Sequence, residues 1–104
     1  MPNNIEKKFK YDISYRETRI IHFGNKYDWF HMEHGNPVHI LKFANKEAIL
    51  TIDVLKLTVH TELIHPKKGE TKLIRSGNFT SKLIERIFDN PRAHMPPNII
   101  SEYL

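Results

Sequence analysis

Hydrophobic and polar residues alternate along the first two-thirds of the chain. Alternation with a period of two is typical of β-strands, because successive side chains point to opposite faces of a sheet. Short clusters of β-branched and aromatic residues between turn residues strengthen this prediction. The pattern predicts strands over residues 9–15, 19–23, 27–32, 38–43, 48–54, 57–65 and 71–75. The run 48–57 also fits a buried helix, and periodicity does not decide between strand and helix there.

Turn residues between these runs indicate how the strands are connected. Gly24, Asn25 and Lys26 tolerate positive φ, so the runs on either side of them are expected to pair as a hairpin. Further turns are expected at residues 33–37, 45–47 and 66–70. Because consecutive strands joined by short connections pair antiparallel, the pattern favours a meander.

One helix is expected near the C-terminus. Thr80 can cap a helix that begins at Ser81, and Asn90 followed by Pro91 ends it. The apolar stripe of this helix is expected to belong to the core, and it consists of Leu83, Ile84, Ile87 and Phe88. The predicted fold class is therefore α+β: an antiparallel β meander or small half-open barrel of about six to seven strands, capped by one C-terminal α-helix.

The length of 104 residues and the hydrophobic content of 39% suit one domain, which is expected to span residues 1–104. Residues 96–104 form an apolar tail, which is expected to dock on the domain or bind a partner. The absence of cysteine excludes disulfides, thiol catalysis and cysteine-containing zinc sites. No signal peptide, membrane-spanning run or cofactor motif is present, so we expect a cytoplasmic protein without membrane or cofactor.

Positive charge is concentrated in the second half of the chain. The net charge is +4, and residues 56–92 carry eight of the 16 basic residues but only four of the 12 acidic ones. Such a surface suits an anionic partner, although the charge can also serve solubility alone. The expected phosphate-binding ridge consists of Lys67, Lys68, Lys72, Arg75 and Lys82, with Arg86 and Arg92 at its margin.

Aromatic residues offer a second element of nucleic-acid binding. On a strand over 27–32, Tyr27, Trp29 and His31 share one face. Tyr27 and Trp29 could then stack on unpaired bases. The alternative is that this face packs in the core of a small sheet.

Histidines allow two kinds of chemistry. His31, Glu33, His34 and His39 are of types that bind zinc, but their spacing matches no strong pattern, and no metal site is assigned. A metal-free ribonuclease would need acid, base and cationic groups, which are available as His60, His65, Lys72, Arg75 and His94. The sequence does not show that these residues meet, so catalytic residues stay unassigned.

The leading hypothesis is a small basic module that binds nucleic acid, with RNA or single-stranded DNA favoured over duplex and with low sequence selectivity. One alternative is a protein–protein interaction module that uses a sheet edge or the apolar C-terminal tail. The other is a small nuclease that uses His, Lys and Arg or a histidine-bound metal. The sequence establishes neither the oligomeric state nor the type of nucleic acid.

Overall fold

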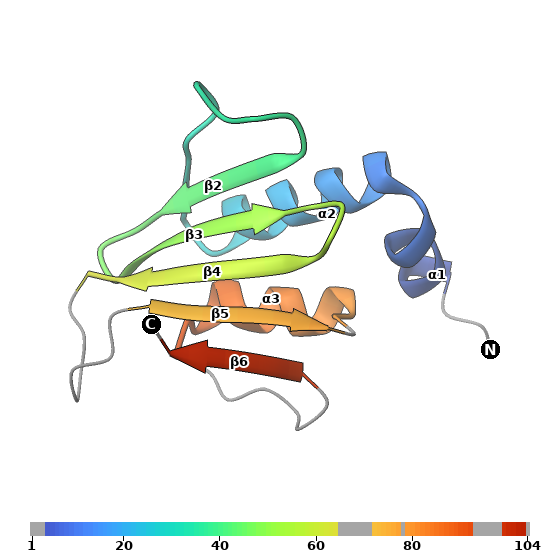
Figure 1. The fold of residues 1–104 in the computed structure, drawn as a ribbon. Coiled ribbons are helices and arrows are strands. Elements are labelled where there is room, and N and C mark those ends of the chain that lie inside the picture. Colours follow the sequence, from blue (N-terminus) through green and yellow to red (C-terminus); the bar gives the residue numbers. More distant parts are fainter. Residues whose placement is uncertain (1–3, 65–71, 78, 93–98, 104) are drawn as a thin grey trace.

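The structure, a computed structural model, describes residues 4–64, 72–77, 79–92 and 99–103. Three helices and six strands follow one another in these residues (Figure 1). Their order is α1 (Asn4–Tyr11), α2 (Ile13–Lys26), β1 (Phe30–His31), β2 (Ile40–Ala44), β3 (Ala48–Asp53), β4 (Thr58–Leu63), β5 (Lys72–Gly77), α3 (Ser81–Asp89) and β6 (Ile99–Tyr103).

The strands form one antiparallel sheet in the order β1-β2-β3-β4-β5-β6, so each strand pairs with its neighbours in the sequence. This confirms the α+β class and the antiparallel meander. Five strands have five or six residues, and β1 adds only a two-residue pairing to β2 at one edge. The number of full strands is therefore smaller than the six to seven expected, and the sheet stays open instead of closing into a barrel.

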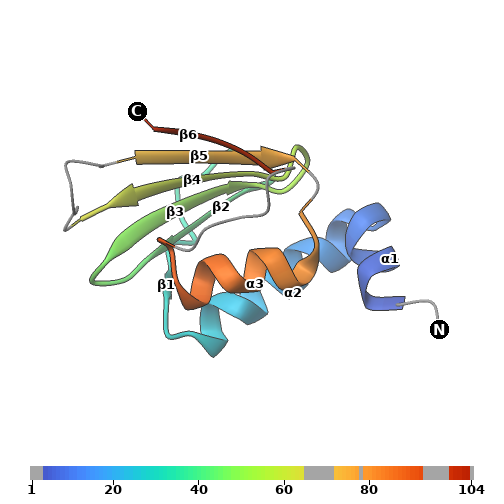
Figure 2. The same cartoon turned by 90° about the horizontal axis from the view of Figure 1, so that it is seen from below.

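The helices lie on one side of the sheet and make a second layer. Figure 2 shows α2 and α3 side by side beneath the strands, with α1 beyond one end of α2. The core between the layers is formed by buried apolar side chains, among them Ile20, Phe23, Phe43, Leu50, Ile52, Val59, Ile84 and Phe88. None of the described helices covers the opposite face of the sheet.

The first two predicted strands, 9–15 and 19–23, are wrong, because these residues belong to α1 and α2. Asp12 caps α2 by accepting a hydrogen bond from the Tyr15 main-chain N at 3.1 Å. The buried positions of α2 recur at helical spacing, namely Arg16, Ile20, Phe23 and Gly24. The helical period therefore overrides the β-branched and aromatic composition that suggested strands.

The expected hairpin around residues 24–26 is also wrong. Gly24 lies inside α2, where a Cβ would come within 2.6 Å of the Phe43 ring, so a glycine is needed for close packing on β2. The chain leaves the helix through Tyr27, and the Trp29 main-chain N donates to the Gly24 carbonyl at 2.8 Å. Of the predicted strand 27–32, only β1 forms, and it pairs with β2.

The later elements agree with the pattern. β2, β3, β4 and β5 lie within or close to their predicted ranges, and residues 48–53 of the ambiguous run 48–57 form a strand. The Asn45 side chain makes the expected turn by accepting from the main-chain N atoms of Glu47 and Ala48. The Thr80 hydroxyl accepts from the Leu83 main-chain N at 3.2 Å, which confirms the predicted cap of α3.

The first helix, α1, and the last strand, β6, both contact the rest of the fold. The Glu6 carboxylate of α1 accepts hydrogen bonds from the main chain and the hydroxyl of Ser81, at the first turn of α3. A carboxylate is favourable there, because the N-terminus of a helix carries partial positive charge. In the tail, residues 99–103 pair with β5 as β6. None of the described helices has the length and apolar character of a membrane span.

Candidate functional site

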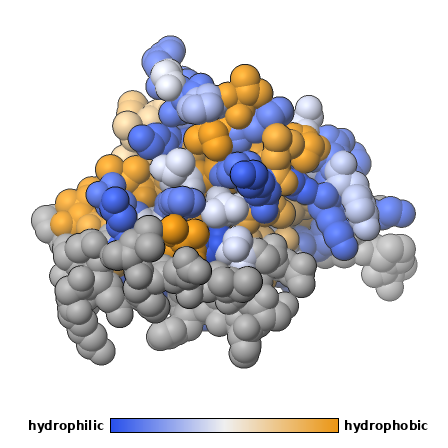
Figure 3. Space-filling model, viewed as in Figure 1, coloured by the Kyte–Doolittle hydropathy of each residue, from blue (hydrophilic) through white to orange (hydrophobic). Residues whose placement is uncertain are grey.

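The face of the sheet that no described helix covers is the candidate site. On β2 to β5 the side chains alternate, so those that face the helices are buried and those on the other face are partly or fully exposed. We call this second surface the open face. Figure 3 shows it as a mixture of hydrophilic and hydrophobic patches. Its residues are Ile40, Lys42, Ala44, Ile49, Thr51, Asp53, Thr58, His60, Glu62, Lys72, Ile74 and Ser76.

Two adjoining depressions hollow the open face, with volumes of about 260 and 500 Å³. They share Lys42, Thr51 and His60, which therefore lie where the two depressions adjoin, and we call the two depressions together the hollow. The smaller depression reaches Glu62 and Lys72. The larger one is bounded by the loop 35–37 and by Lys56.

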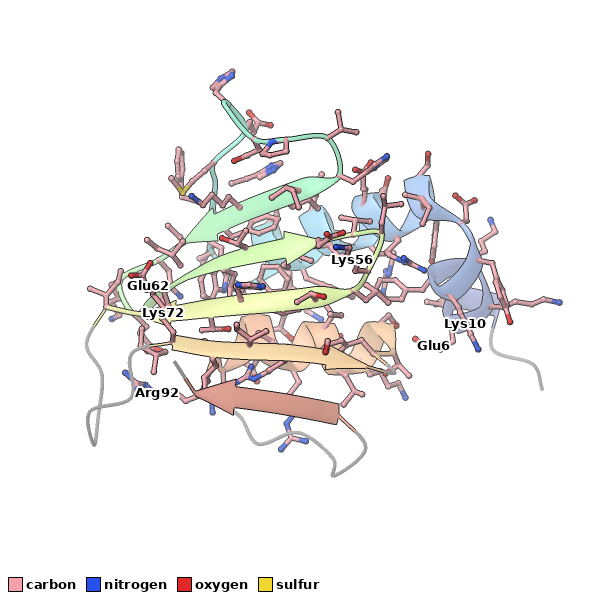
Figure 4. The ribbon with its side chains drawn as sticks, viewed as in Figure 1. Glu6, Lys10, Lys56, Glu62, Lys72 and Arg92 are labelled. Atoms are coloured by element: carbon pink, nitrogen blue, oxygen red, sulfur yellow. The ribbon has the colours of Figure 1, made fainter. Side chains whose placement is uncertain are left out.

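The strand register explains why these groups lie together. Lys42 pairs with Thr51, and Thr51 pairs with His60, so the three form a row across β2, β3 and β4. In the next row Glu62 pairs directly with Lys72. The Cβ atoms of such cross-strand partners are about 4.5–5.5 Å apart. Figure 4 shows Glu62 and Lys72 near each other at one end of β4 and β5, with Lys56 towards the opposite end.

The open face carries cationic groups that the described chain does not neutralise by direct contact. No ion pair within 4.0 Å forms at Lys42, Lys56 or Lys72 among the described residues. The Asp53 carboxylate accepts from the main-chain N atoms of Leu55 and Lys56 at 3.0 Å, so it stabilises the β3–β4 turn. An anion that enters the hollow can therefore approach three ammonium groups.

The predicted ridge does not form one surface among the described residues. Lys72 lies on the open face, whereas Lys82 and Arg86 are exposed on α3, in the helical layer. Arg92 is partly exposed beyond the end of α3. Lys67 and Lys68 fall outside the described residues. The sheet thus separates basic residues that are neighbours in the sequence.

Arg75 is placed differently from its prediction as a phosphate ligand. It is 2% exposed and faces the helical layer, because it alternates with Lys72 and Ile74 along β5. Its Nη2 donates to the Pro91 carbonyl at 2.8 Å. Arg75 therefore joins β5 to the chain after α3, and its guanidinium is not presented to an external phosphate.

The stacking platform of Tyr27 and Trp29 is not formed. Trp29 is 5% exposed, packs edge-on against Phe88 and donates from Nε1 to the Phe88 carbonyl at 2.9 Å. The Tyr27 hydroxyl donates to Glu85 Oε2 at 2.9 Å. Both residues follow α2 instead of lying on a continuous strand. Their side chains contact α3, so they do not form a common surface on which bases could stack.

The histidines of the candidate metal cluster take separate roles. The ring of His31 stacks on Phe43 with a centroid distance of 4.8 Å, and its Nδ1 lies 3.6 Å from Glu33. His39 Nδ1 lies 3.5 Å from the Glu17 carboxylate on α2. Within the described ranges, no three His, Asp or Glu side chains come together in a way that could hold a metal ion.

The residues considered for ribonuclease chemistry do not all lie together either. His60 and Lys72 share the open face, Arg75 lies beneath it, and His65 and His94 fall outside the described residues. Sequence reasoning missed Lys56 at the β3–β4 turn, and it also missed Lys42 and Glu62 on the strands. The alternation of β2 and β4 shows that Lys42 and Glu62 each lie on the polar face of their strand. Only the strand register shows which residues of the other strands lie beside them.

The open face brings ammonium, imidazole, carboxylate and hydroxyl groups around a hollow that solvent reaches. Such a set can bind an anionic ligand and place a proton donor and a proton acceptor beside it. No protein-family model, curated protein or solved structure matches the chain. The chemistry of the open face is therefore the only basis on which a function can be inferred for the described residues.

Proposed function

We propose that the protein binds single-stranded nucleic acid, RNA or single-stranded DNA, across the open face. One observation carries this proposal: Lys42, Lys56 and Lys72 line two adjoining depressions and form no ion pair in the described chain. Ammonium groups bind phosphates mainly by charge, so the expected affinity is largely electrostatic and weakly selective for sequence.

The positions of the lysines suit a ligand that extends across the strands. Lys42 is on β2 and Lys72 is on β5, three strand spacings away, which corresponds to about 14 Å. Lys56 lies at the β3–β4 turn. A polyanion that spans the open face would be long enough to reach all three ammonium groups, whereas a small anion would meet only one or two of them.

The lining between the lysines favours unpaired bases. His60 offers an exposed ring on which a base can stack, and Ile49 and Ile74 add apolar surface. No described helix stands out from the open face to enter the major groove of a duplex. These features support single-stranded over double-stranded ligands.

Fluorescence anisotropy with labelled single-stranded RNA, single-stranded DNA and duplex DNA at low salt tests the proposal. We expect both single strands to bind more tightly than the duplex. Lys42→Glu with Lys72→Glu reverses two charges of the hollow and should weaken binding by about tenfold or more. The matched control is Lys82→Glu with Arg86→Glu, which makes the same charge change on α3.

Two results would overturn the proposal. One is an absence of binding to any of the three ligands at low salt, where charge interactions are least screened. The other is a loss of binding in the α3 variant while the open-face variant binds normally, because this would place the ligand on the helical layer. Circular dichroism of each variant checks that the fold is retained.

A further inference from the structure

We propose that the open face also cleaves the RNA that it binds, with Glu62 as general base and His60 as general acid. This inference rests on the proposed function, because the substrate is the bound single strand. The reaction is the attack of a ribose 2′-hydroxyl on the neighbouring phosphate, which requires neither a metal ion nor a water molecule as nucleophile. The protein must supply a proton acceptor, a proton donor and positive charge at the phosphate.

The geometry of β4 places the proton acceptor Glu62 and the proton donor His60 far enough apart for one phosphate to lie between them. His60 and Glu62 are two residues apart on one strand, so both side chains lie on the open face. Successive residues on one face of a strand are about 7 Å apart. In-line displacement needs the base and the acid on opposite sides of the phosphorus, and this spacing leaves room for one phosphate between them.

Both groups are available for proton transfer. His60 and Glu62 are exposed and line the same depression. No side-chain hydrogen bond or ion pair with another described residue occupies either of them. Other polar groups of the site, such as Asp53, are already used to stabilise a turn.

The two nearest lysines supply the charge. Lys72 is the direct cross-strand partner of Glu62, and Lys42 lies in the row of His60 with Thr51 between them. All of these residues line the smaller depression. Ammonium groups at these places can contact the non-bridging phosphate oxygens, where negative charge accumulates in the transition state.

The chemical step is balanced without any co-reactant. The Glu62 carboxylate takes the proton of the 2′-hydroxyl, and the 2′-oxygen forms a bond to phosphorus. The bond from phosphorus to the 5′-oxygen of the next nucleotide breaks, and the His60 imidazolium donates its proton to that oxygen. The products are a 2′,3′-cyclic phosphate and a free 5′-hydroxyl. DNA lacks the 2′-hydroxyl, so it is expected to bind without being cleaved.

Three oligonucleotides of one sequence, incubated with the full chain in excess EDTA, test the inference: RNA, 2′-O-methyl RNA and DNA. Gel electrophoresis and mass spectrometry identify the products, and anisotropy with the DNA measures binding separately. We expect cleavage of RNA alone, with cyclic-phosphate ends. Glu62→Gln and His60→Ala should each slow cleavage by about 100-fold or more. Glu62→Gln should bind DNA at least as tightly as the original chain, since it removes one negative charge.

The matched controls are Glu47→Gln and His22→Ala, which make the same two changes at exposed residues outside the open face and should retain cleavage. Binding of RNA without cleavage would overturn this inference and leave the proposed function intact. Absence of binding to every oligonucleotide would overturn both. Cleavage that persists in Glu62→Gln and His60→Ala, or that extends to 2′-O-methyl RNA, would assign the activity to another site or a contaminant and overturn the inference.

Discussion

The Arg16 guanidinium donates a hydrogen bond to the Val54 carbonyl at 2.5 Å, which joins α2 to the end of β3. The same side chain donates to the carbonyls of Phe9, at 2.8 Å, and Lys10, so it also holds the end of α1. Arg16 is 5% exposed, and this burial lowers its pKa. Because a buried guanidinium needs partners for its N–H groups, main-chain carbonyls from two segments converge on it, one at the end of α1 and one after β3.

We expect Arg16→Lys to destabilise the fold by about 2–4 kcal/mol, because a lysine cannot direct donors to all of these carbonyls and leaves some of them buried without a partner. Urea unfolding followed by circular dichroism measures the change. The exposed Arg86 provides the control, since Arg86→Lys should alter the stability by less than about 0.5 kcal/mol. Equal stabilities of the two variants would show that the Arg16 contacts contribute little.

The strands of the second half of the chain could be predicted because their alternation coincides with burial. On β4 the buried residues are Val59, Thr61 and Leu63, and the residues between them are partly or fully exposed. The N-terminal helices were missed because residues 9–23 are rich in β-branched and aromatic residues, although their buried positions follow a helical period. Local composition and tertiary packing disagree there, and packing decides.

The candidate site could be predicted only in part. A basic residue such as Lys72 is visible as charge in the sequence, but its neighbours on the open face come from positions 10 to 30 residues away. Glu62 meets Lys72, and His60 lies in the row of Lys42, through the pairing of strands. Register depends on the whole sheet, so the sequence pattern of any single strand does not reveal these combinations.

Gly24→Ala tests the packing of α2 on β2. A Cβ at residue 24 would lie 2.6 and 2.8 Å from two atoms of the Phe43 ring, which is fully buried between Phe88 and His31. Although alanine favours a helix, the overpacking should outweigh this gain and destabilise the fold by about 1–2 kcal/mol. Gly24→Ala combined with Phe43→Leu should recover part of the loss in thermal unfolding. A more stable Gly24→Ala protein would contradict the close approach.

The pH dependence of stability should reveal the contact between α2 and α3. Lys26 Nζ donates to Glu85 Oε2 at 2.5 Å, and this hydrogen bond, with that from Tyr27, holds the pKa of Glu85 below its ordinary value. Because the pKa is lower in the folded state, the contribution is complete above the ordinary glutamate pKa of about 4.3 and disappears as the pH falls through the folded value.

Urea unfolding of the original chain and of Glu85→Gln at several pH values between 7 and 3 checks this prediction. The original chain should be the more stable one at pH 7, and the difference should shrink below about pH 4.5. The matched control is Glu47→Gln, because Glu47 is exposed and has no ion pair in the described chain. A difference between the original chain and Glu85→Gln that stays constant down to pH 3 would show that the carboxylate charge is not responsible.

Thr61 is a site where stability can be gained. It is 1% exposed in the core, and its hydroxyl has no hydrogen-bond partner among the described residues. Thr61→Val keeps the shape and removes the unpaired polar group, so we expect a stabilisation of about 1 kcal/mol. Thr58→Val, on the open face of the same strand, should change the stability by less than about 0.5 kcal/mol. A destabilised Thr61→Val protein in thermal unfolding would indicate that the hydroxyl is hydrogen-bonded.

The salt dependence of binding counts the phosphates that the open face contacts. For a single strand, the logarithm of the binding constant falls with the logarithm of salt concentration by about 0.7 per phosphate, so contacts at Lys42, Lys56 and Lys72 predict a slope of about −2. Lys42→Gln with Lys72→Gln should reduce the slope to about −0.7. A slope near −3.5 that falls only after Lys67→Gln with Lys68→Gln would instead assign binding to the ridge predicted from the sequence. Anisotropy titrations at four or five salt concentrations distinguish these results.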